Sequence, residues 1–336
     1  MSSSEPSTEP SAATSLPILP AAADLPGTCS AFEFGAPSGT PYPCFSHKDN
    51  KERWAKWGHA PRLIALRLPI TRGGGRLEPS GDAAFLLDLF NSPALRAHLT
   101  PLSPTGTLSQ LSGTATRVHA PRLATTSTSL SFFDALIPAV LGVSEKAPTA
   151  SGRSGSSAAA ATAPPTSIVW IRRRLEEPWE GMTIGDALRE ALVLPPEGDP
   201  EGCDPSGSAE CLQQPNRFSH LFTPPQRQQF LFHAARWVAG GGPMSQHEDE
   251  WTPYAAAVRD VARELLTVVR GADGGVAVAT VVWAVRGVEG VSLSGAKAGE
   301  GGGLFPCDSP HNVCWVCYDP VHRCAHLLHS SFVPYW

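Results

Sequence analysis

The chain has 336 residues, a formal net charge of −5 and an apolar content of 42%, so it can bury a sizeable core. It has no long basic block, no apolar run of about 18 residues and no basic start before an apolar stretch. These absences disfavour a nucleic-acid partner, a membrane partner and secretion, so we expect an intracellular protein. The 31 glycines and 33 prolines are concentrated in a few segments, and the folded part is therefore smaller than the chain.

Low-complexity segments set the predicted domain organisation. Residues 1–28 are rich in Ser, Pro and Ala and are expected to form a disordered tail. Residues 29–336 are expected to form a single α+β domain with flexible insertions at about 145–165, 195–215 and 290–305. Helical and strand patterns are mixed without strict alternation, which favours α+β over a doubly wound sheet.

The first part of this domain predicts short strands and capped helices in turn. The elements are a strand at 31–34, a helix from Ser46 through Trp57, a strand at 62–68, a helix capped by Asp82, a short helix at 94–99 and a turn-rich stretch at 102–116. A strand at 167–171 and a helix begun by the pair Thr183 and Asp186 follow the first insertion.

The longest stretch without low complexity, 219–270, predicts two amphipathic helices. Thr223 with Gln226 forms a capping box, and the helix is expected to run to Val238 and to end at the following glycines. The second helix is expected to be capped by Thr252. Its apolar stripe comprises Tyr254, Val258, Val261, Leu265 and Val268. Beyond it, 276–285 predicts a strand, and 313–318 with 324–329 predicts a hairpin around Asp319-Pro320.

The loop between these helices, SQHEDEW, carries four consecutive ionisable residues. His247 and Asp249, with His322 or His326, could imitate the two-histidine, one-carboxylate iron site of oxygenases. Such ligands normally stand on rigid strands, whereas these lie in a loop. The alternative is that the carboxylates of 248–250 favour the positive N-terminus of the next helix.

A second cluster of possible metal ligands lies near residue 320. Its members are Cys307, His311, Cys314, Cys317, His322, Cys324, His326 and His329. The spacing departs from that of zinc fingers, and positions three apart on a strand point to opposite faces. We therefore favour reduced, buried thiols over zinc. With no phosphate loop and no nucleophile turn in the sequence, we expect no enzyme, no cofactor and no metal.

Four collinear segments resemble the cilia- and flagella-associated protein 300 family. They are RWAKWGHAPRLIALRL at 53–68, SLSFFDAL at 129–136, the central block at 222–270 and VCWVCYDPVHRCAHLLH at 313–329. The resemblance covers about two thirds of the chain and leaves out the three insertions.

This resemblance implies a non-enzymatic adaptor for the assembly of outer and inner dynein arms in motile cilia and flagella. It implies residence in the cytoplasm and the axoneme, and partners among dynein arm assembly factors, dynein subunits and the intraflagellar transport machinery. The alternatives are the metal-dependent oxygenase and a fixed structural component of the axoneme. As partner-binding residues we predict Glu248, Asp249 and Glu250 of the loop with Arg259 and Arg263 of the following helix.

Overall fold

The computed structural model describes residues 31–39, 42–60, 62–73, 77–145, 169–193, 216–242, 245–271, 274–293 and 303–332. The expected tail at 1–28, the expected insertion at 195–215 and almost all of that at 145–165 lie outside these ranges. The range of about 290–305 expected for the third insertion lies partly within them. It overlaps a strand that ends at Ser292 and includes the buried side chains of Leu304 and Phe305.

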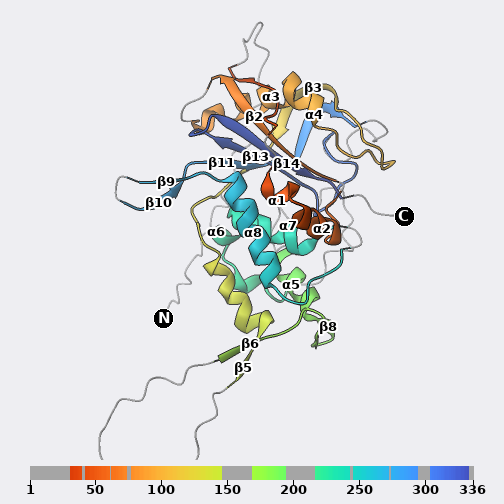
Figure 1. Ribbon diagram of the computed structural model, residues 1–336, viewed down its shortest axis with the longest axis vertical. Coiled ribbons are helices and arrows are strands. Elements are labelled where there is room, and N and C mark those ends of the chain that lie inside the picture. Colours follow the sequence, from red (N-terminus) through yellow and green to blue (C-terminus); the bar gives the residue numbers. More distant parts are fainter. Residues whose placement is uncertain are drawn as a thin grey trace, which may run out of the picture.

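A six-stranded antiparallel sheet forms the middle layer of the molecule (Figure 1). Its strands, in spatial order, are β1 (Glu33–Phe34), β2 (Leu63–Arg72), β14 (Cys324–Ser330), β13 (Val313–Asp319), β11 (Val281–Ala284) and β4 (Arg122–Leu123). The predicted hairpin around Asp319-Pro320 is confirmed as β13 and β14. It occupies the centre of the sheet, because β14 also pairs with β2 and β13 with β11.

Helices and smaller sheets cover both faces of this sheet (Figure 1). One face carries α3 (Asp82–Asn91), α4 (Pro93–His98) and the pair β3 (Ser112–His119) and β12 (Gly287–Ser292). The other carries α1 (Pro43–Ser46), α2 (Lys48–Lys56), α5 (Ile184–Val193), α6 (Pro224–Arg227), α7 (Phe230–Gly240) and α8 (Thr252–Leu265). The hairpins are β5 (Gly142–Glu145) with β6 (Val169–Arg172), β7 (Pro178–Trp179) with β8 (Met182–Thr183), and β9 (Val268–Arg270) with β10 (Val276–Val278). The α+β prediction is confirmed.

Alternating side chains of the central hairpin separate two hydrophobic cores. Trp315, Cys317 and Leu328 belong to the core under α7 and α8. Their neighbours Val316 and Leu327 belong to the core under α3. Successive residues of a strand point to opposite faces, so one hairpin supports both cores. Among the described residues, no helix is long and apolar enough to cross a membrane.

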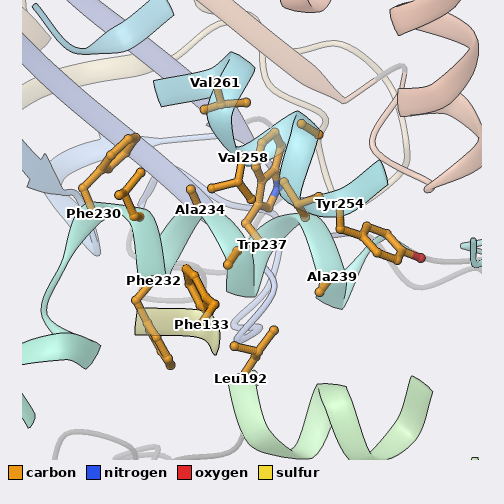
Figure 2. Packing of buried hydrophobic residues seen from close by; sticks show 14 of the residues in the cluster. Phe133, Leu192, Phe230, Phe232, Ala234, Trp237, Ala239, Tyr254, Val258 and Val261 are labelled. Carbon is orange, nitrogen blue, oxygen red and sulfur yellow. The ribbon is translucent and has the colours of Figure 1, made fainter. Parts of the chain in front are cut away.

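Helix α7 is the centre of the larger core (Figure 2). Ala234 and Val238 are fully buried, and Trp237 stacks on Trp54 of α2 with ring centroids 5.1 Å apart. Val258 of α8 packs on the same helix. The helix ends at Gly240, and Gly241 adopts the positive φ of +64° that glycine tolerates, as predicted.

The prediction of one helix from Pro224 to Val238 is wrong, because the chain is extended at Gln229. The capping box is present, with Thr223 N–H donating to Gln226 Oε1 at 2.8 Å. However, the segment after β4 inserts at the break. Ala124 N–H donates to Gln228 O at 2.9 Å, and Phe230 N–H donates to Ala124 O at 2.8 Å. These long-range bonds replace the helical bonds that the local sequence favours.

Several predicted boundaries also need correction. Gly81 rather than Asp82 occupies the N-cap of α3, and Trp251 rather than Thr252 occupies that of α8. The predicted strand at 276–285 divides into β10 and β11, and the stretch at 102–116 includes the start of β3. Val268 was predicted to belong to the apolar stripe of α8, but it lies in β9 and is 52% exposed.

Candidate partner-binding groove

A groove of about 290 Å³ lies between the segment that follows Leu130 and the start of α8. Its lining residues share a pattern of apolar side chains with charges among them: Leu130, Ser131, Phe133, Asp134, Ile137, Leu141, Arg173, Glu250, Trp251, Thr252, Ala255 and Arg259. The groove includes two of the predicted partner-binding residues, Glu250 and Arg259.

Aromatic rings fix the apolar wall of the groove. Phe133 is buried, and its ring centroid lies 5.9 Å from that of Trp251 and 6.3 Å from that of Phe232 of α7 (Figure 2). The wall is therefore anchored in the larger core. The pair Phe132-Phe133 lies in the segment SLSFFDAL, and a signal for this wall was thus present in the sequence, although it did not predict a groove.

Charged side chains of both signs surround this wall. Asp134, Glu250 and Arg259 are exposed, and Arg173 is partly buried with its guanidinium 5.5 Å from the ring centroid of Trp179. An apolar floor with a mixed polar rim is the usual composition of a transient protein interface. The arrangement can hold an apolar side chain of another protein and orient its charged neighbours.

The loop before α8 is fixed to the body by Glu248. Its carboxylate accepts from Lys56 Nζ at 2.8 Å and from Trp57 Nε1 at 2.9 Å, and its N–H donates to the Tyr254 hydroxyl at 3.0 Å. The Asp249 carbonyl accepts from Leu175 N–H at 2.9 Å. Of the predicted partner-binding residues, Glu248 thus has structural contacts, while the side chains of Asp249, Glu250, Arg259 and Arg263 are exposed. Arg263 pairs with Asp260 at 3.6 Å, away from the groove.

The structure does not bring together the residues named for the oxygenase alternative. His247 lies against the guanidinium of Arg189 on α5, and both burial and that cation lower the pKa of its imidazole. His322 instead bonds through Nδ1 to Asp319 Oδ2 at 2.7 Å. Among the described residues, His247 and Asp249 belong to no group of ligand atoms close enough to share a metal ion.

The eight residues of the proposed cysteine and histidine cluster do not converge as a set. Cys314 and Cys317 belong to different cores on opposite faces of β13, as strand alternation predicts. Both thiols are free and buried, as predicted, and burial raises their pKa well above the ordinary value. Cys324 and His326 do come together, with Asp319 as a third member that the sequence interpretation missed. The Cys-x-His spacing on one strand face was the available signal.

Taken together, fold and site define an α+β protein that has an apolar groove with a charged rim and in which many buried polar groups make structural contacts. The sequence model of the family described as cilia- and flagella-associated protein 300 matches residues 31–200 and 211–330. The chain belongs to this family and is a cilium- or flagellum-associated protein.

Two curated relatives show the extent of the similarity. The chain is 24% identical over 287 residues to cilia- and flagella-associated protein 300 of Chlamydomonas reinhardtii, covering 85% of this chain and 92% of the relative. It is 23% identical over 167 residues to the protein of the same name from Paramecium tetraurelia, covering 49% and 54% respectively. No solved structure matches the chain.

Proposed function

We propose that this protein is a non-enzymatic adaptor for the assembly of outer and inner dynein arms, acting in the cytoplasm and in the axoneme of motile cilia and flagella. The observation that carries the proposal is the family match, which spans both the central block and the central hairpin of the sheet. The groove at Phe133 and Trp251 supports it, because it offers a binding surface built on a rigid core.

The proposed partners are dynein arm assembly factors, with dynein subunits and the intraflagellar transport machinery as further candidates. The groove fits a segment that presents one apolar side chain flanked by charged residues. Glu250 and Arg259, which are exposed on its rim, would orient that segment. Glu248 would act indirectly by holding the loop against Lys56 and Trp57.

The direct test of the function is to remove the chain from a flagellated cell and to examine the axonemes by electron microscopy. We expect outer and inner dynein arms to be absent and to return when the wild-type chain is expressed. Axonemes that keep both sets of arms would refute the proposed function. Extraction of normal flagella with salt and then detergent separates an adaptor from a fixed structural component, which would resist both steps.

The test of the groove is charge reversal at its rim. We expect Glu250→Lys combined with Arg259→Glu to reduce the recovery of dynein arm assembly factors with the tagged chain, because both groups face the docked segment. The matched control is Glu289→Lys, an exposed reversal on β12 across the sheet, which should leave recovery unchanged. Equal recovery with the double variant and the control would exclude the groove while leaving the assembly function open.

A further inference from the structure

Three side chains with metal-binding atoms meet at the Asp319 end of the central hairpin. The carboxylate of Asp319, the thiol of Cys324 and the imidazole of His326 place their ligand atoms within 4.8 Å of one another. Cys324 and His326 are two residues apart on β14 and therefore share a face of the sheet. Asp319 lies directly across the hairpin from Cys324. The backbone register, rather than a mobile loop, brings the three together.

A hydrogen bond fixes which nitrogen of His326 carries the proton. The Tyr42 hydroxyl has one hydrogen and donates it to Leu66 O at 3.0 Å. In that arrangement it accepts from His326 Nδ1, which lies 2.7 Å away. The imidazole is therefore protonated at Nδ1, and Nε2 presents its lone pair to Cys324 Sγ at 3.3 Å. Histidine ligands of metals commonly donate their other ring N–H to such an oxygen.

The separation of Cys324 Sγ and His326 Nε2 is close to that of two ligands in a tetrahedral zinc site. Zinc binds thiolate sulfur at about 2.3 Å and imidazole nitrogen at about 2.0–2.1 Å, so the two ligand atoms should stand about 3.6 Å apart. The Sγ to Nε2 distance of 3.3 Å is close to this value. Burial, with Asp319 next in effect, raises the pKa of the Cys324 thiol to about 11, and the protonated thiol donates to Nε2. A bound metal would replace that proton.

Four hydrogen bonds, two to each oxygen, hold the carboxylate of Asp319 in place. Its oxygens accept from the Thr267 hydroxyl, from His322 Nδ1 and from the N–H groups of Val321 and His322. Although burial raises the pKa of Asp319, the bonds from Thr267 and His322 lower it overall. The group is therefore an ionised ligand with a fixed orientation.

The cluster faces a cavity of about 380 Å³ that leaves room for a fourth ligand. Arg67 and Glu264 also line this cavity. A divalent ion and the Arg67 guanidinium together carry three positive charges. The Cys324 thiolate and the carboxylates of Asp319 and Glu264 supply three negative charges, and Arg263, which also lines the cavity, is paired with Asp260 at 3.6 Å.

We propose that Asp319, Cys324 and His326 bind a zinc ion, with the fourth position open to the cavity. Sulfur, nitrogen and oxygen together form a ligand set that suits zinc, and three protein ligands with an open position describe a zinc centre that can accept a further ligand. On binding, the Cys324 thiol releases its proton to solvent, and no oxidant or reductant is needed. The site lies at the end of the sheet and is independent of the groove.

Cobalt binding to the purified full-length chain tests this proposal. Dialysis against a chelator should give a metal-free chain, and Co²⁺ should then produce a thiolate-to-cobalt absorption band that saturates at one ion per chain and disappears on addition of Zn²⁺. Cys324→Ser should abolish the band. The matched control is Cys314→Ser, which removes a buried thiol on the opposite face of the same hairpin. This variant should keep the absorption band.

A second variant covers the case in which Cys324→Ser does not fold. Tyr42→Phe keeps the aromatic ring but removes the oxygen that fixes the His326 tautomer, so cobalt affinity should fall about 10- to 100-fold with the far-ultraviolet circular dichroism unchanged. A wild-type chain that gives no thiolate band with Co²⁺ overturns the proposal. A band that survives Cys324→Ser, or that Cys314→Ser also removes, overturns the assignment of these ligands.

Discussion

At the scale of single residues, several polar groups stabilise the fold from positions where the sequence suggested another role. Asp82 was predicted to cap a helix, but its carboxylate is buried and accepts from the guanidinium of Arg122 and from Trp283 Nε1. The residue type was informative, since an Asp before an apolar helix is often a cap. Its true partners are 40 and 201 residues away, and no local pattern predicts them.

We predict that Asp82→Ala lowers the free energy of unfolding by about 3 kcal/mol, because it leaves the Arg122 charge and the Trp283 N–H without their shared acceptor. Urea denaturation followed by circular dichroism measures the change. Glu289→Gln, which alters an exposed pair with His119, should leave the midpoint unchanged. An Asp82→Ala midpoint equal to that of the wild type would show that this buried pair does not stabilise the fold.

His59 gives the fold a sensitivity to acid. It is buried against both Trp54 and Trp237, Nε2 has no partner in the described structure, and burial lowers its pKa to about 3. In the unfolded chain a histidine titrates near 6.5. Between these values the unfolded state binds more protons, so stability is complete above about pH 6.5 and declines as the pH falls towards 3.

We predict that His59 alone contributes about 1–2 kcal/mol of destabilisation between pH 7 and pH 5. Replacing it with the non-titrating ring in His59→Phe should reduce the loss of stability over that interval. His47→Gln, at an exposed position before α2, should not reduce it. Denaturant unfolding at the two pH values provides the comparison, and equal losses in His59→Phe and wild type would contradict the prediction.

At the scale of elements, local signals predicted where helices begin better than where they are interrupted. The pair Thr183 and Asp186 and the box at Thr223 were confirmed by their hydrogen bonds. The break at Gln229 was missed because its cause is the segment after β4. The Gln229 side chain accepts from Ser127 N–H at 3.0 Å and donates to Thr126 Oγ1 at 2.8 Å, more than a hundred residues away in sequence.

We predict that Gln229→Ala destabilises the protein by about 1–3 kcal/mol, since the Ser127 N–H loses its acceptor at a partly buried position. The exposed neighbour supplies the control, and Gln228→Ala should have little effect. Thermal and urea unfolding of the two variants side by side measure the difference. Equal stability of both variants would mean that the backbone bonds of Ala124 hold the break without the side chain.

At the scale of the whole molecule, the sequence predicted the α+β class and the central hairpin, but not the order of the strands. Alternating apolar residues identify strands, whereas pairing between β2 and β14 joins segments more than 250 residues apart. The groove shares this limitation, because it combines residues from distant segments whose chemistry was visible in the sequence and whose proximity was not. The Asp319 cluster differs, because its three members lie within the predicted hairpin.

Because one hairpin supports both cores, we predict that they unfold together. Leu327 and Leu328 are adjacent, fully buried and on opposite faces of β14. Leu327→Ala and Leu328→Ala should each lower the free energy of unfolding by about 2–5 kcal/mol. Each variant should still unfold in a single transition, and that transition should be the same when it is followed by tryptophan fluorescence and by circular dichroism. Separate transitions in either variant would indicate two independent folding units.

The order of the strands also has a consequence for synthesis on the ribosome. The hairpin that completes the sheet follows β2 by about 240 residues of chain, and at about 5–20 residues per second it emerges tens of seconds later. Throughout that interval the inner edge of β2 has no strand to pair with and its apolar faces lack their cover. We therefore expect the nascent chain to need chaperones until translation reaches the sheet's middle strands.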